Sequence, residues 1–77
     1  MPRPNSLAFR LNFNRAALIA RPSDTESLHD AMIRTIEQHA GSAVSECGRC
    51  KRAGEHYRYP ITLANGERGH AIVEGNA

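Results

Sequence analysis

The sequence predicts a small two-layer α+β domain of order β-α-β-β-β, in which one amphipathic helix packs on an antiparallel sheet. Three observations lead to this fold class. Residues 7–13 alternate apolar and polar side chains, residues 28–40 carry apolar side chains at helical spacing, and residues 55–73 alternate again around an Asn-Gly pair. A chain of 77 residues has room for one domain, 1–77, and we expect flexible ends at 1–5 and 75–77.

The first predicted strand is the segment SLAFRLNFN, residues 6–14. One side of this segment is apolar and would face the core: Leu7, Phe9, Leu11 and Phe13. The other side carries Arg10 and Asn12, which together with Arg58 and Thr62 of a later strand predict an exposed, arginine-bearing sheet face. The run RAALIA that follows, residues 15–20, is too short to distinguish a helical turn from an extended segment.

The predicted helix runs from Asp24 to Ala40. Ser23 can serve as its N-cap, because Glu26 three residues later completes a capping box. Gly41 supplies the left-handed conformation that ends many helices. One face carries a stripe of apolar side chains: Leu28, Met32, Ile33, Ile36 and Ala40. This stripe predicts a helix that buries one side against the sheet.

The C-terminal half of the chain predicts three strands, at residues 42–47, 55–63 and 68–74. The last two strands are joined by Asn65-Gly66, which is typical of a two-residue type I′ turn. Such a turn would produce the cross-strand pairs Ile61–His70 and Tyr59–Ile72.

Two features of the second of these strands bear on its environment. Pro60 has no N–H to donate, so it predicts either an edge strand or a solvent-facing position. Tyr57 and Tyr59 are in phase with Ile61 and Leu63, which predicts that both tyrosines lie in the core.

The composition is that of a soluble globular domain, with 40% apolar and 23% charged residues. The net charge of +2 is too small to imply nucleic-acid binding by itself. No apolar run approaches the ~18–20 residues that cross a bilayer, and the N-terminal region has no secretory signal pattern. We therefore expect a cytoplasmic protein with no membrane partner, in which a cysteine pair is more often reduced or metal-bound than disulfide-bonded.

The two cysteines, Cys47 and Cys50, have the C-x2-C spacing that supplies two ligands of many zinc sites. His56 is a candidate third ligand and His70 or His39 a candidate fourth, although a complete signature would carry a second ligand pair at a recognisable spacing. A redox dithiol has less support, because no helical pattern follows the pair. The remaining interpretation is a loop between two strands, with free thiols and no cofactor.

Basic residues cluster around the cysteine pair: Arg49, Lys51, Arg52 and Arg58. With the tyrosines at 57 and 59 they could contact phosphates and stack on bases, which makes a small zinc-dependent nucleic-acid-binding domain the alternative function. The sequence contains no glycine-rich phosphate loop, no nucleophile elbow and no paired-carboxylate motif, and so short a chain can hardly enclose a pocket of ~300 Å3. We therefore expect no enzymatic activity.

The function that the sequence favours is that of a non-enzymatic interaction protein. Asp30 and Glu37 give the helix an acidic face that could occupy the basic site of a partner, and the arginines of the sheet face could meet an acidic partner protein. In size and composition the chain resembles the small inhibitor and accessory proteins of phages and mobile elements, anti-CRISPR proteins among them. This resemblance implies that it binds another macromolecule and inhibits or adapts it. A homodimer formed through exposed strand edges is a further alternative.

Overall fold

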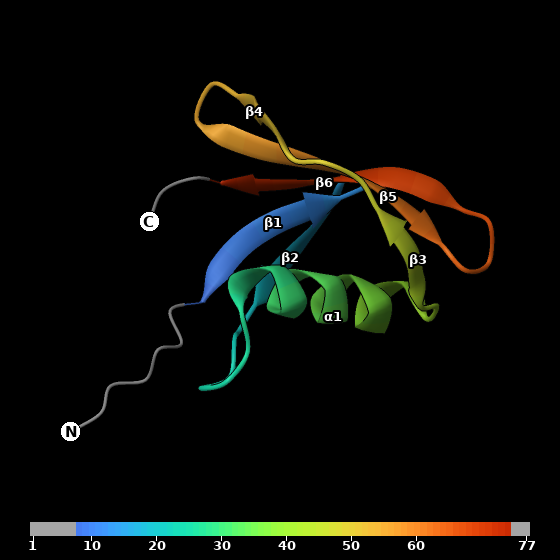
Figure 1. Ribbon diagram of the computed structural model, residues 1–77, viewed down its shortest axis with the longest axis horizontal. Coiled ribbons are helices and arrows are strands. Elements are labelled where there is room, and N and C mark those ends of the chain that lie inside the picture. Colours follow the sequence, from blue (N-terminus) through green and yellow to red (C-terminus); the bar gives the residue numbers. More distant parts are fainter. Residues whose placement is uncertain (1–7, 75–77) are drawn as a thin grey trace.

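The chain forms an N-terminal hairpin, one helix and a C-terminal group of four strands (Figure 1). The computed structural model describes residues 8–74, so the ends that were expected to be flexible, 1–5 and 75–77, lie outside the described residues. The elements are β1 (Phe9–Phe13), β2 (Ala16–Ala20), α1 (Leu28–Ala40), β3 (Val44–Cys47), β4 (Lys51–Ala53), β5 (His56–Leu63) and β6 (Arg68–Glu74).

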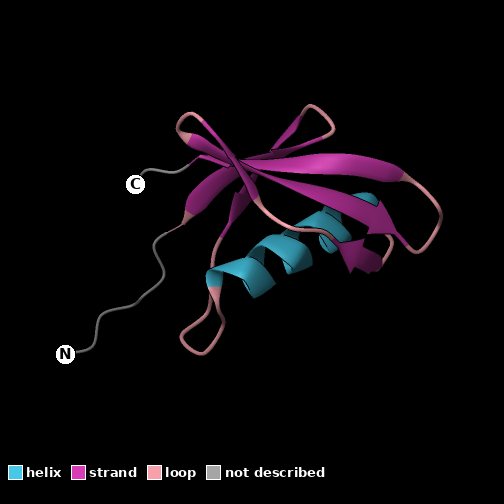
Figure 2. Cartoon of the chain, turned by 45° about the horizontal axis from the view of Figure 1, so that its top comes forward, coloured by secondary structure: helices cyan, strands magenta, loops and turns pink. Residues whose placement is uncertain are grey.

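One antiparallel sheet and one helix make two layers, which confirms the predicted α+β class. The strands lie in the order β2-β1-β6-β5-β3, and β4 pairs with the other half of β5. Figure 2 shows α1 against one face of the sheet, with no other described element on the opposite face. The core between the layers is hydrophobic throughout: Leu11, Phe13, Ala20, Ala31, Met32, Ile36, Ile61, Leu63 and Ala71.

The sheet contains two strands more than the sequence predicts, so the observed order is β-β-α-β-β-β-β. The run RAALIA, which the sequence left undecided, provides β2. The basic connection after the cysteine pair contains β4, which returns to β5 through a two-residue turn. Gly54 allows this turn, because its φ of 68° is favourable for glycine and rarely adopted by other residues.

A two-residue turn at Asn14 and Arg15 joins β1 to β2. Both residues have positive φ, 50° and 74°, as a type I′ turn requires. The turn closes on the pair Phe13–Ala16, and the register continues unbroken to the ends of both strands. Asparagine often adopts this left-handed conformation and arginine rarely does, which explains why the sequence pattern does not reveal the hairpin.

The turn between β5 and β6 is one residue longer than predicted, so the predicted type I′ turn at Asn65-Gly66 is wrong. The Leu63 amide donates to the Glu67 carbonyl at 2.8 Å, and in this turn only Gly66 has a positive φ, of 96°. These features define a three-residue loop with a bulge at the glycine.

The longer loop shifts β6 by one residue relative to the predicted register, and such a shift turns every side chain of a strand to the other face. The observed pairs are Pro60–His70, Ile61–Gly69 and Tyr59–Ala71 instead of Ile61–His70 and Tyr59–Ile72. His70 and Ile72 therefore lie on the sheet face away from the helix.

The helix begins four residues later than predicted, at Leu28 rather than Asp24. Ser27 is its N-cap, because Ser27 Oγ accepts a hydrogen bond from the Asp30 amide at 3.0 Å. The predicted end is confirmed, since Gly41 caps the helix with a φ of 71°. Within residues 8–74 no helix is long and apolar enough to cross a membrane.

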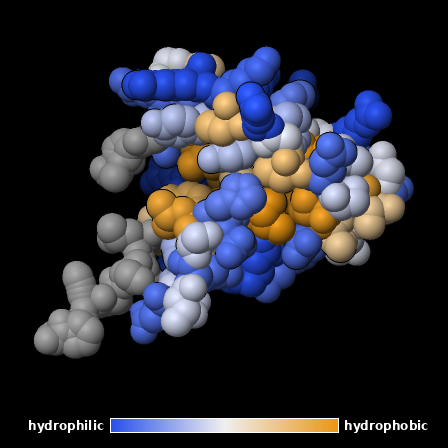
Figure 3. Space-filling model, viewed as in Figure 1, coloured by the Kyte–Doolittle hydropathy of each residue, from blue (hydrophilic) through white to orange (hydrophobic). Residues whose placement is uncertain are grey.

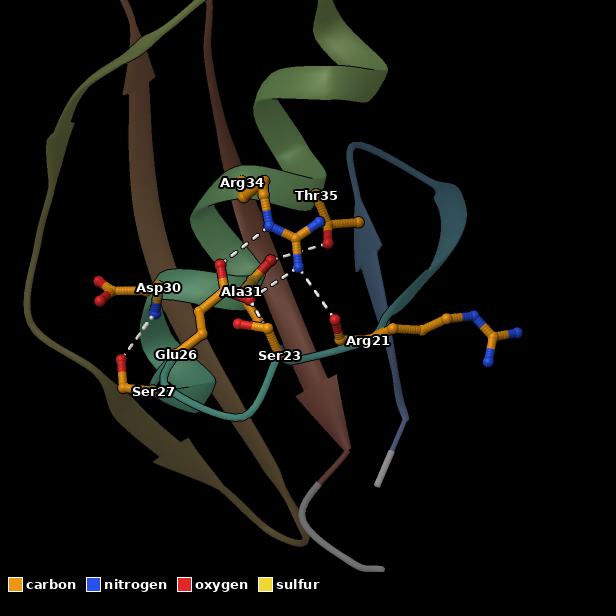
Figure 4. A network of polar contacts seen from close by, with 8 residues as sticks. All are labelled: Arg21, Ser23, Glu26, Ser27, Asp30, Ala31, Arg34 and Thr35. Carbon is orange, nitrogen blue, oxygen red and sulfur yellow. Dashed lines mark hydrogen bonds and ion pairs between the residues drawn. The ribbon is translucent and has the colours of Figure 1, made fainter. Parts of the chain in front are cut away.

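The predicted capping pair, Ser23 and Glu26, forms in a separate turn before the helix (Figure 4). The Ser23 amide donates to Glu26 Oε1 at 3.1 Å, and the Glu26 carboxylate also accepts two hydrogen bonds from Arg34, at 2.8 and 2.9 Å. These contacts, those from Arg34 above all, lower the pKa of Glu26 to about 2. Arg34 also donates to the Arg21 carbonyl at 2.9 Å, which fastens the segment after β2 to the helix.

β5 is an interior strand, so of the two predicted alternatives for Pro60 the edge strand is wrong and the solvent-facing position is confirmed. β6 pairs along one side of β5, while on the other side β3 pairs with residues 61–63 and β4 with residues 56–58. Pro60 lies between these two partners, where its carbonyl accepts a hydrogen bond from the Gly48 amide at 2.8 Å. Since the N and C=O of a strand residue point to the same side, the missing N–H faces the break between β3 and β4 and takes no bond away from the β6 ladder.

Candidate interaction surface

The sheet face opposite α1 is uncovered by described residues, and we call it the open face. Its side chains are those that alternate with the core residues along each strand. One row crosses four neighbouring strands through the middle of this face: Asn12, Ile72, Arg58 and Lys51. The four residues that the sequence placed on an exposed sheet face all lie here: Arg10, Asn12, Arg58 and Thr62.

The open face carries four cations and two exposed acids, Glu46 and Glu74, so its net charge is positive. Lys51 and Arg58 occupy directly opposed positions on β4 and β5, which places two like charges side by side. Arg10 and Arg68 are exposed on the same face. Within residues 8–74 the one salt bridge lies elsewhere, in the turn before α1, so none of these four cations is paired with a described acid. Opposed like charges destabilise a free sheet and favour the binding of an anionic group.

Apolar side chains lie among the cations of the open face. Ile72 is half-buried in the central row, next to Arg58 in the register. Ile19 of β2 is 53% exposed and lies opposite Arg10. Arginine beside exposed apolar area is a combination typical of protein–protein interfaces.

The predicted zinc ligands are divided between the two faces of the sheet. His56 and His70 lie on the open face, whereas Cys47 pairs with the core residue Ile61 and faces α1. His39 lies in the last turn of α1. The structure therefore does not bring either of the sheet histidines to the cysteine pair.

A histidine that the sequence analysis did not select lies beside Cys47. His29 Nε2 is 3.5 Å from Cys47 Sγ, and the His29 ring meets the Tyr59 ring edge-on, with 5.8 Å between the ring centroids. Burial, with Cys50 as the smaller cause, raises the pKa of Cys47 and so favours the thiol form at neutral pH. The thiol can donate to the Gly48 carbonyl at 3.7 Å, and the direction of its hydrogen bond with His29 Nε2 is set by the imidazole tautomer.

The contact between His29 and Cys47 does not extend to a metal centre. Among residues 8–74 no three side chains of His, Cys, Asp or Glu are grouped closely enough to hold a metal ion. Cys47 and Cys50 are free thiols, the first half-buried and the second exposed. Burial raises the pKa of Tyr59, and the neighbouring Cys50 raises it further. The geometry thus gives the zinc hypothesis no support from the described residues.

The two tyrosines lie on the helix side of the sheet, in the phase that the sequence predicts. Both are half-buried, and Tyr59 packs against the core. Arg52 lies opposite Tyr57 and shares this phase, so it is not part of the open face. Arg49 lies in the exposed turn between β3 and β4. In Figure 3 hydrophilic residues gather over the end of the molecule that β4 and β5 form.

The acidic residues predicted to bind a partner belong to α1, on the other side of the sheet from the open face. Asp30 is exposed in the first turn. Glu37 is half-buried, and its carboxylate accepts a hydrogen bond from the Val44 amide at 2.8 Å, which ties the end of the helix to β3. The predicted acidic residues therefore lie on a different surface from Arg10, Lys51 and Arg58 of the open face.

Two residues of these surfaces were not predicted from the sequence, His29 and Ile72, and only His29 has a sequence pattern that indicates its position. His29, Ile33, Ile36 and Ala40 follow helical spacing, so His29 takes the first-turn position of the stripe that the sequence assigned to Leu28, which is 63% exposed. Ile72 carries no such signal, because its face depends on the length of the turn that precedes β6.

In comparisons with protein-family models, curated proteins and solved structures, none matches this chain. Support for a binding role of the open face therefore comes from the residues of this chain.

Proposed function

We propose that this chain is a non-enzymatic interaction protein whose open face binds an acidic surface of a partner protein. The observation that carries the proposal is the opposed pair of cations, Lys51 and Arg58, on a sheet face that no described residue covers. An acidic partner would relieve their repulsion and bury the neighbouring Ile72. By occupying such a surface, a small domain inhibits or adapts its partner without any chemistry of its own.

The side chains on the open face fit a protein partner better than nucleic acid. Single-stranded nucleic acid is usually held by aromatic side chains that stack on the bases. Tyr57 and Tyr59 are on the helix side of the sheet, as are Phe9 and Phe13. The open face offers arginine and aliphatic side chains instead, which supports a protein interface.

Affinity capture from the cells that make this protein tests the proposal with two charge-reversed variants. K51E/R58E reverses the opposed pair on the open face, and R49E/R52E makes the same change in net charge outside it. We expect a partner protein that wild type and R49E/R52E retain and K51E/R58E loses. With the purified partner, K51E/R58E should bind at least about tenfold more weakly than the matched control.

Thermal unfolding of both variants shows whether each keeps its fold. Equal capture by K51E/R58E and wild type would overturn the proposal. Capture that nuclease treatment abolishes would assign the open face to nucleic acid, as would salt-sensitive binding of a mixed-sequence oligonucleotide that K51E/R58E loses.

A further inference from the structure

β2 forms one end of the sheet, with β1 on one side and no described strand on the other. The turn between the two strands closes on Phe13 and Ala16, so the amide of Ala16 faces β1. By alternation the backbone groups of Ala17 and Ile19 face away from β1. These two residues present two N–H and two C=O groups along a free edge.

The opposite end of the sheet is protected against further pairing, and β2 is not. β3 has four residues and a register shift between Val44 and Glu46, and β4 has three residues, two of them cationic. Short strands, bulges and charged side chains are the usual protection of a sheet edge. β2 has five residues, AALIA, without charge or proline and with an unbroken register to β1.

Two exposed arginines flank this edge, Arg15 before β2 and Arg21 after it. A second copy of the chain could use all four free backbone groups only by placing Ala17 of one copy opposite Ile19 of the other. That register also places Arg15 of each copy opposite Arg21 of the other, so like charges would meet at both ends of the pairing. The charges therefore oppose self-pairing and favour a strand that is acidic at both ends.

Local structure fixes the backbone at both arginines. Arg15 has a φ of 74°, a conformation that is unfavourable for arginine and freely available to glycine. Strained residues of this kind concentrate at functional sites, and this one is a cation at the start of the edge. At the other end, the Arg21 carbonyl accepts the hydrogen bond from Arg34, which fixes the point where the edge stops (Figure 4).

We infer that the free edge of β2 takes up an extended segment of the partner protein that carries acidic residues six positions apart on either side of an apolar centre. The segment runs antiparallel to β2, and its backbone forms hydrogen bonds with the backbone of Ala17 and Ile19. Its acidic residues form ion pairs with Arg15 and Arg21. Its apolar side chains lie beside Ile19, so the edge and the open face form one continuous surface. This inference deepens the proposed function and rests on it.

The full-length protein and a fluorescently labelled peptide, Glu-Thr-Val-Thr-Val-Thr-Glu, provide the test. In the antiparallel register the two glutamates lie opposite Arg15 and Arg21, and the two valines lie opposite Ala17 and Ile19. Fluorescence anisotropy should show binding at least about tenfold tighter than that of the peptide with both glutamates replaced by lysine. N-methylation of both valines removes the backbone donors and should abolish binding.

Two variants keep the test independent of folding defects. R15E/R21E should reverse the preference and bind the lysine-flanked peptide, a result that an unfolded protein cannot give. A17P removes an outward N–H from an edge position where proline is tolerated, and it should weaken binding while thermal unfolding remains cooperative.

Equal affinity for the two peptides, or unchanged affinity in A17P, would overturn the inference. A concentration-dependent dimer that A17P dissociates would assign the edge to a second copy of the chain. A further outcome is that wild type binds neither peptide while capture of the partner protein still depends on Lys51 and Arg58. That result would overturn the inference about the β2 edge and leave the proposed function of the open face standing.

Discussion

His29 of α1 and Cys47 of β3 are in direct contact, with 3.5 Å between Nε2 and Sγ. The contact joins the first turn of the helix to the sheet margin. Cys47 is half-buried there, whereas Cys50 at the other end of the same C-x2-C motif is exposed. The two thiols of one motif therefore occupy different environments.

We expect these thiols to react at different rates. Cys50 in the C47S variant should react with an aromatic disulfide reagent at least about tenfold faster than Cys47 in the C50S variant, because the thiolate is the reactive form and burial raises the pKa of Cys47. The rate for Cys47, followed by absorbance, should still be rising at about pH 9. H29A in the C50S background uncovers Cys47, so it should reduce the difference in reaction rate between Cys47 and Cys50. Equal rates in the two single variants would contradict this interpretation.

Gly69 of β6 lies against the side chain of Asn14, so a Cβ at this position would overlap Asn14 Oδ1 and Cγ. G69A should lower the free energy of unfolding by about 1–3 kcal/mol, since either the turn or the Asn14 side chain must move. Urea unfolding measures this loss. N14G removes the obstructing side chain and suits the φ of 50° at that position, so N14G/G69A should recover most of the stability. Additive losses in the double variant would exclude the overlap as the cause.

Arg15 offers a stabilising substitution with a functional consequence. R15G should raise the free energy of unfolding by roughly 0.5–1 kcal/mol, because Asn-Gly suits a type I′ turn better than Asn-Arg. The same variant should bind the glutamate-flanked peptide more weakly, since one flanking cation is lost. N14G is the matched control, and its stability should change less because asparagine tolerates the left-handed conformation. Urea unfolding measures these free energies. An R15G variant less stable than wild type would contradict the inference that the backbone of Arg15 is strained.

Glu26 should make the stability of the fold depend on pH in the acid range. Its pKa in the folded protein is about 2, below the ordinary 4.5, chiefly because of the hydrogen bonds from Arg34. A carboxyl with a lowered folded-state pKa stabilises fully above its ordinary pKa, and this contribution is lost as the pH falls toward the folded-state value. The difference in unfolding free energy between wild type and E26Q should therefore be largest above about pH 5 and shrink as the pH falls toward about 2.

Urea unfolding at several pH values measures this difference. E55Q, which changes an exposed carboxylate in the turn between β4 and β5, is the control for the general effect of acid. A difference between wild type and E26Q that stays constant from about pH 6 to about pH 2 would show that the contacts of Glu26 do not depend on its charge.

The faces of Arg10 and Arg58 could be predicted from the sequence, because alternation along one strand is a local property. The face of His70 could not, because it depends on whether the preceding loop has two residues or three. The longer loop is supported from outside the hairpin, where the Ala64 amide donates to the Ala43 carbonyl at 2.7 Å. Contacts of this kind leave no periodic pattern in the sequence, and the same holds for the approach of His29 to Cys47.

The start of the helix could not be predicted from the sequence for a different reason. Two capping patterns overlap in the sequence, Ser23-x-x-Glu26 and Ser27-x-x-Asp30. Both form hydrogen bonds in the structure, but Ser27 caps the helix while Glu26 is engaged by Arg34. Capping propensity alone does not show which of two adjacent serines caps the helix. The choice depends on the contact between Glu26 and Arg34, which lies in the second turn of the helix.

Pro60 divides one margin of the sheet into two segments that can open separately. A residue other than proline would form two hydrogen bonds with a neighbouring strand at this position, one through its N–H and one through its C=O. Pro60 has no N–H and only accepts one hydrogen bond, from Gly48. Separation of β4 from β5 therefore need not spread to β3, which is bonded to the far half of the same strand. In amide hydrogen exchange the two segments should behave as separate cooperative units, with the turn from Cys47 to Cys50 as the joint between them.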